Sequence, residues 1–224
     1  MKRVYIIVEG QTERAFVHEV IRPHLSVHGL HSIPRLLRTG EHKGGVISYQ
    51  RARSAALDLL KGDRRAYCTT MFDFFQLPRD FPCLPVLGSH SAERKADILE
   101  KAFFADIAAN LRPALRPDRF LPYIQMHEFE GLLFSDPDGF CAAIHQDDLA
   151  ESVRAIRRRF GTPEDIDDGQ ETAPSKRILR LLPDYQKAQD GPIAASAIGL
   201  AVIRRECRHF NDWVSRLERL AEGA

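Results

Sequence analysis

The first apolar stretch of the chain is typical of a buried strand in a parallel sheet. Residues 4–8 are apolar without interruption and mostly β-branched, as expected of a strand covered on both faces. Polar residues follow at once, and a helical pattern begins at Arg14, with Thr12 as the predicted N-cap. Since ligands of α/β proteins bind at the carboxyl ends of strands, Glu9, which directly follows this strand, is a candidate functional residue.

Strand-like and helix-like patterns alternate through the first part of the chain. Three further strands are predicted, at residues 33–37, 65–75 and 120–126. Helices are predicted between them, at residues 14–25, 48–60 and 92–111, and Pro23 is expected to bend or end the first. This alternation predicts an α/β fold, with a parallel sheet flanked by helices.

The pattern changes after Asp136, where no convincing strand remains. The rest of the chain is predicted to be helical, with one irregular stretch at residues 161–175. We therefore expect an α/β domain at residues 1–136 and a C-terminal helical extension at residues 137–224. The extension is expected to pack on the sheet rather than to form an independent domain.

Composition indicates the class of protein but no particular binding partner. Lys and Arg number 32 against 31 for Asp and Glu, so a surface that binds nucleic acid has to be a local patch. The four cysteines are scattered, which suits reduced thiols in a cytosolic protein and makes a cysteine zinc site unexpected. No apolar run approaches the roughly 20 residues of a membrane span, and Glu9 interrupts the first apolar stretch, so we expect a cytoplasmic protein without a signal peptide.

Carboxylates follow several of the predicted strands. Glu9 follows the first, Asp73 closes the third, and Glu128 and Glu130 follow the fourth. In a parallel sheet these ends share one edge, where clustered carboxylates would repel one another unless a cation offsets their charge. Mg²⁺ or Mn²⁺, which prefer oxygen ligands and serve phosphoryl transfer, fit this role. Glu13, on the following helix, is expected to lie further back.

A plainer interpretation stays open, because 31 acidic residues must lie somewhere and strand ends are often acidic. Glu9 would then be a solvated loop residue and Glu13 would only favour the helix dipole. His127 is similarly open: it is either a ligand, acid or base, or a buried histidine that shapes the turn. If the segment after it is helical, Glu128 and Glu130 point about 200° apart, and Glu128 is the one expected to face the metal.

The first acidic elements resemble the TOPRIM fold of topoisomerases, primases and OLD-type nucleases. In that fold a glutamate after the first strand precedes glycine, as in Val8-Glu9-Gly10, and an Asp-x-Asp pair follows the third. Here Asp73 matches the first aspartate, but Phe75 stands at the second. The resemblance implies that Glu9 is a general base or ligand and Asp73 the principal ligand. We expect Glu128, or Asp80 reaching back from seven residues after Asp73, to complete the site.

Two longer segments make the resemblance more specific. His127–Phe134 and Asp167–Arg177 are similar to segments of a prokaryotic TOPRIM-like family of unknown function, related to OLD-type nucleases. The resemblance implies a nuclease-like site and a neighbouring ATPase in phage-defence loci. The rival hypothesis, motivated by Phe75, is a non-catalytic module that docks on an ATPase. Phosphatase or primase-like transfer would need the same metal site.

Basic residues supply candidate contacts to nucleic acid, and the alternative for each cluster is a solvated surface. They form one stretch near the second strand and a pair in the C-terminal half: Arg35, Arg38, Lys43 and Arg51, then Lys176 and Arg177. A further copy of this chain is another candidate partner, in a homo-oligomer. His24 and His28 are four residues apart, as in zinc-binding helices, but Pro23 and the missing glutamate between them weaken this signal.

Overall fold

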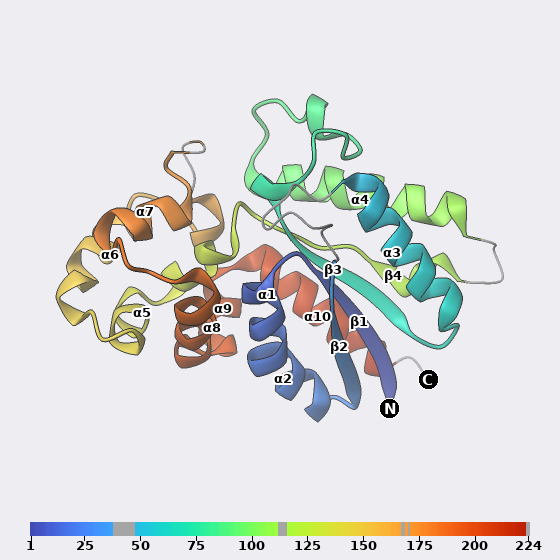
Figure 1. Cartoon of the computed structure of the whole chain (residues 1–224), viewed down its shortest axis with the longest axis horizontal. Coiled ribbons are helices and arrows are strands. Elements are labelled where there is room, and N and C mark those ends of the chain that lie inside the picture. The colour runs from blue at the N-terminus through green and yellow to red at the C-terminus, as the bar shows by residue number, and fades with distance from the viewer. Residues whose placement is uncertain (38–47, 112–115, 167–168, 170, 223–224) are drawn as a thin grey trace.

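The predicted α/β architecture is confirmed by a computed structural model, which describes residues 1–37, 48–111, 116–166, 169 and 171–222. All strand pairs are parallel, in the order β2-β1-β3-β4, with β5 pairing β3 further along (Figure 1). The strands are β1 (Lys2–Val8), β2 (Leu30–Leu36), β3 (Tyr67–Asp73), β4 (Phe120–Leu121) and β5 (Ile124–Gln125). The first and third predicted strands are therefore neighbours, as the shared acidic edge requires.

Both faces of the sheet are covered, which explains the uninterrupted apolar run of β1. Ile6 and Ile7 point to opposite faces and belong to two different hydrophobic clusters. One face carries α3 (Tyr49–Gly62) and α4 (Ala92–Asn110). The other carries the N-terminal helices and most of the C-terminal ones.

The first helix starts earlier and runs further than predicted. It consists of α1 (Gln11–Phe16), a π-helical turn (Val17–Ile21) and α2 (Arg22–Val27). The N-cap is Gly10 rather than Thr12, because the Glu13 carboxylate reaches back and accepts a hydrogen bond from the Gly10 amide at 2.9 Å. Pro23 does not end the helix, since it follows the π turn, where the hydrogen-bond register already shifts.

The fourth predicted strand is broken into β4 and β5 at Pro122. Proline has no amide hydrogen to donate to the ladder of β3. Two threonine side chains of β3 bridge the break instead: Thr69 Oγ1 donates to the Leu121 carbonyl at 2.5 Å, and Thr70 Oγ1 bonds both the amide and the carbonyl of Tyr123. The edge of the sheet thus keeps its hydrogen bonds while the chain changes direction.

The C-terminal half is helical, as predicted, and shares its core with the sheet. Its helices are α5 (Pro137–Ala143), α6 (Ala150–Arg157), α7 (Pro174–Leu181), α8 (Lys187–Ile198), α9 (Leu200–Glu206) and α10 (Arg208–Glu222). Figure 1 shows α8 beside α1, and Gly191 permits this approach, because a Cβ there would lie 3.4 Å from the Thr12 side chain of α1 and 3.1 Å from Phe129 and from the Tyr185 hydroxyl. None of the described helices combines the length and apolar character needed to span a membrane.

Trp213 connects α10 to the centre of the sheet. Its ring stacks on Tyr123 with centroids 4.4 Å apart, and its Nε1 donates to Thr69 Oγ1 at 2.9 Å. Both side chains are buried. A single hydroxyl therefore joins β3, the broken edge strand and the C-terminal helix.

We expect Thr69→Val to lower the free energy of unfolding by about 1–3 kcal/mol, because the buried Trp213 Nε1 loses its acceptor. Urea denaturation followed by the fluorescence of the single tryptophan measures this. Ser32→Ala is the matched control: the Ser32 hydroxyl is buried and has no hydrogen-bond partner in the described part of the chain, so its loss should cost less than about 1 kcal/mol. Equal effects of the two substitutions would contradict the role given to Thr69.

Candidate active site

Glu9 and Asp73 meet at the carboxyl edge of the sheet. Val8 of β1 pairs with Met71 of β3, so the residues that follow the two strands come side by side. The Asp73 amide donates to Glu9 Oε1 at 3.0 Å. Asp73 is buried, and its Oδ1 has no hydrogen-bond partner in the described structure. The predicted convergence of the two strand ends is thus present in the structure.

Three further buried carboxylates surround this pair: those of Glu13, Glu128 and Glu130. The charges of all three raise the pKa of Asp73. Glu13 was expected to lie further back, but its charge acts on Asp73 more strongly than that of Glu9, since the capping contact to Gly10 turns it toward the strand ends. We call Glu9, Glu13, Asp73, Glu128 and Glu130 the acidic cluster.

Glu128 and Glu130 both face the ammonium of Lys187, whereas an α-helix would have pointed them about 200° apart. Lys187 Nζ, at the start of α8, lies 3.8 Å from Glu128 Oε1 and 3.4 Å from Glu130 Oε1. The prediction assumed an α-helix, whereas Glu128 is extended and the residues after it form a 3₁₀ helix (Phe129–Ser135). In that geometry two carboxylates separated by one residue reach a common point.

Burial and mutual repulsion shift the protonation of the acidic cluster. Burial raises the pKa of Asp73 well above its usual range, and the charges of Glu13 and Glu9 raise it further. Burial and the charge of Glu13 likewise raise the pKa of Glu9. Burial raises the pKa of Glu130 to about 7 against the opposing effect of Lys187. For Lys187, the charges of Glu130 and Glu128 outweigh burial, so its pKa is raised and its ammonium stays charged.

The segment after the acidic turn also contributes to the site. The Ser175 amide, in the first turn of α7, donates to Glu128 Oε2 at 2.9 Å, so the end of the predicted Asp167–Arg177 motif lines the acidic cluster. Arg177 is buried, donates to the Thr172 carbonyl at 2.6 Å and lies over the Phe160 ring. Its guanidinium therefore braces the segment rather than facing solvent.

His127, which precedes Glu128 in the chain, packs against Phe75. The Phe75 amide donates to the His127 carbonyl at 3.1 Å, and the two rings lie 5.2 Å apart. His127 is buried and also contacts Phe74. These contacts favour the interpretation of His127 as a residue that shapes the turn, and they place an aromatic ring where a second aspartate was expected.

Asp80 does not join the acidic cluster. It is exposed, and its charge acts on the hydroxyl of Tyr49, at the start of α3. Tyr49 packs on the neighbouring Phe81. The loop that carries Asp80 therefore packs on α3 through Phe81, and Asp80 is not among the charges that raise the pKa of Asp73.

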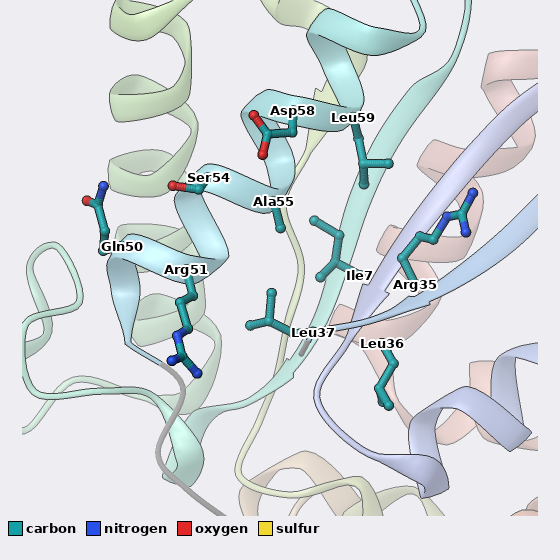
Figure 2. A pocket seen from close by; sticks show the side chains of 10 residues that line it. All are labelled: Ile7, Arg35, Leu36, Leu37, Gln50, Arg51, Ser54, Ala55, Asp58 and Leu59. Atoms are coloured by element: carbon teal, nitrogen blue, oxygen red, sulfur yellow. The ribbon is translucent and has the colours of Figure 1, made fainter. Parts of the chain in front are cut away.

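The basic residues near β2 border a pocket of about 470 Å³ between that strand and α3 (Figure 2). Arg35 approaches it from the strand and Arg51 from the helix, and both are exposed. Arg35 also lies over the Tyr5 ring. Lys176 is exposed on α7. Arg38 and Lys43 lie outside the described residues.

The donor set of the acidic cluster fits a hard divalent cation. Carboxylate oxygens are the ligands that Mg²⁺ and Mn²⁺ prefer, and Asp73 Oδ1 is a buried acceptor without a hydrogen bond in the described residues. In the described part of the chain, however, no three of these carboxylates bring oxygen atoms within 4.8 Å of one another. An ion held by one or two carboxylates and several waters, as is usual for Mg²⁺, is compatible with this spacing.

Comparisons with known proteins assign a family and leave its activity open. The family model described as "Domain of unknown function (DUF4276)" matches residues 8–218. The chain belongs to this family. No curated protein matches it. The solved C-terminal region of the OLD protein of Xanthomonas campestris pv. campestris is similar at 16% identity and a TM-score of 0.41, over 97% of this chain and 96% of that one.

No sequence pattern indicated two residues that lie at the site, Lys187 and Tyr185. The buried Tyr185 hydroxyl has no hydrogen-bond partner in the described structure, and Glu130 and Glu128 are among the charges that raise its pKa. Both residues lie in the helical half, more than 50 positions from the nearest carboxylate of the cluster. The packing of α8 on α1 and on the 3₁₀ helix (Phe129–Ser135) brings them to the site, and no local pattern marks it.

We expect the stability of the metal-free protein to fall as pH rises from about 4.5 to about 7, because Glu130 ionises near 4.5 when unfolded and near 7 when folded. Glu130→Gln should remove this part of the slope and raise the free energy of unfolding at pH 8 by up to about 3 kcal/mol. Urea denaturation in EDTA across this pH range measures it. Glu93 is exposed, so Glu93→Gln is the control and should keep the wild-type dependence of the unfolding free energy on pH. The wild-type dependence in Glu130→Gln would refute the raised pKa assigned to Glu130.

Proposed function

We propose that the protein is a Mg²⁺- or Mn²⁺-dependent phosphodiesterase that cleaves DNA or RNA. The observation that carries this proposal is the convergence of the acidic cluster at the carboxyl edge of a parallel sheet, around the ammonium of Lys187. Buried carboxylates repel one another, and a site that keeps so many is poised to bind a cation. The TOPRIM-like sequence elements at Glu9 and Asp73 add support to the same chemistry.

Four of the five residues of the cluster have positions suited to a role. Asp73 would be the principal ligand, because its Oδ1 accepts no hydrogen bond in the described residues. Glu9, whose pKa is raised, is suited to accept a proton from the attacking water. Glu128 is oriented by the Ser175 amide and would complete the ligand set together with Glu130. The metal ion, when bound, would polarise the phosphate and stabilise the leaving oxygen.

A phosphodiester approaching this site needs positive charge, since the carboxylates alone repel it. Lys187 is 43% exposed at its side chain and lies beside Glu130, so its ammonium is available to a phosphate at the rim. Arg35, Arg51 and Lys176 are the exposed basic residues that would extend this contact. The ATPase partner rests on the family resemblance of the sequence and stays a proposal.

A second function, a non-catalytic module docking on an ATPase, is favoured by two observations. Phe75 replaces the second aspartate and packs on His127. Within the described residues, no three carboxylates of the cluster form a compact ligand set. A module of this kind would keep the fold while binding metal weakly.

We expect Glu9→Gln and Asp73→Asn each to reduce metal-dependent cleavage of nucleic acid by more than about a hundredfold, since the ion supplies several kcal/mol of transition-state stabilisation. Purified protein, alone and with its neighbouring ATPase, would be assayed on DNA and RNA with Mg²⁺ or Mn²⁺. Asp80→Asn, a carboxylate outside the cluster, is the matched control and should retain activity. Undiminished cleavage in the first two variants would exclude the assigned site.

Metal binding separates the two proposed functions. For the enzyme, Mn²⁺ should raise the melting temperature of the wild type and of Asp80→Asn, but not of Asp73→Asn, because only the folded cluster binds the ion. Calorimetric or fluorescence melts at increasing Mn²⁺ measure this. No shift in the wild type would favour the non-catalytic module.

A further inference from the structure

Two histidines and a glutamate meet far from the acidic cluster, between the N-terminal and C-terminal helices. His24 lies in the last turn of α2 and His28 caps its C-terminal end, four residues later on the same helix face. Glu218 reaches them from α10. In the described part of the chain, they form the one group of three or more His, Cys, Asp or Glu residues whose ligand atoms all lie within 4.8 Å of one another.

We propose that His24, His28 and Glu218 bind a divalent transition-metal ion, Zn²⁺ in particular, which fastens α2 to α10. Two imidazoles and a carboxylate are ligands that zinc takes, and three protein ligands leave a fourth position for water. Tetrahedral ligand atoms at zinc distances stand about 3.3 Å apart. The two histidine Nε2 atoms lie 2.6 Å and 3.7 Å from Glu218 Oε1, on either side of that spacing.

The site is open to solvent and differs in chemistry from the acidic cluster. The side chains of His24, His28 and Glu218 are 27%, 41% and 18% exposed, so an ion can enter without unfolding. Imidazole favours zinc, copper and nickel, whereas Mg²⁺ prefers oxygen ligands. The two sites are therefore expected to select different ions.

Arg204 of α9 pairs with the Glu218 carboxylate, which is one of the three proposed ligands. Its Nη1 lies 2.5 Å from Glu218 Oε1 and 3.4 Å from His24 Nε2, and its Nη2 lies 3.1 Å from Glu218 Oε2. The guanidinium also donates to Asn211 and Ser215, which hold it in place. An ion bound to Glu218 Oε1 and His24 Nε2 displaces both contacts of Nη1, and Arg204 can then orient the ligating carboxylate through Oε2.

Titration of the metal-free full-length chain with ZnCl₂, by isothermal calorimetry, tests the proposal. His28→Ala should weaken binding at one site by more than about tenfold, since loss of a ligand costs at least as much as loss of a group that orients one. His18→Ala, an exposed histidine in the same helical segment, is the matched control and should bind like the wild type. Circular dichroism checks that both variants fold.

Two further measurements assign the ion. Co²⁺ in place of Zn²⁺ should give the visible absorption of a tetrahedral site in the wild type and in His18→Ala, and lose it in His28→Ala. Asp73→Asn should leave that absorption intact. The proposal is overturned if the wild type binds no zinc, if His28→Ala binds it as the wild type does, or if Asp73→Asn rather than His28→Ala abolishes binding. These outcomes do not depend on any cleavage activity.

Discussion

Repulsion among buried carboxylates at the carboxyl edge of the sheet is the constraint on which the site depends. Glu9, Asp73 and Glu130 carry raised pKa values because burial disfavours their ionisation and neighbouring carboxylates disfavour it further. Lys187 offsets part of the negative charge. Protonation or a bound cation would neutralise the remaining negative charge. The arrangement therefore favours binding of a cation and does not stabilise the fold.

The broken edge of the sheet brings the second pair of glutamates to that point. Pro122 interrupts the ladder, and β5 resumes pairing where Asp73 faces Gln125, at the very end of β3. After Gln125, which lies opposite Asp73, the chain leaves the sheet. It then enters the 3₁₀ helix that begins after Glu128 and contains Glu130. A regular fourth strand would continue along the sheet and would not turn at this point. The Thr69 and Thr70 hydroxyls replace hydrogen bonds that the break removes from the ladder.

The helical half completes the site as well as covering the sheet. Lys187 neutralises charge from α8, and the Ser175 amide orients Glu128 from α7. Trp213 of α10 joins the same β3 residue, Thr69, that bridges the broken edge. Because the apolar core is shared, a change in the C-terminal helices should reach the acidic cluster through packing.

The sequence alone determined the parallel sheet and the edge at which Glu9 and Asp73 meet, because continuous apolar strands and helical periodicity are local properties of the chain. The tertiary structure decided which other groups face that edge. Lys187 carries no local signal, Glu13 turns inward through its contact with Gly10, and Phe81, next to Asp80, packs on Tyr49 of α3. Glu218 meets His24 across 194 positions, a contact that exists only because packed helices bring distant residues together.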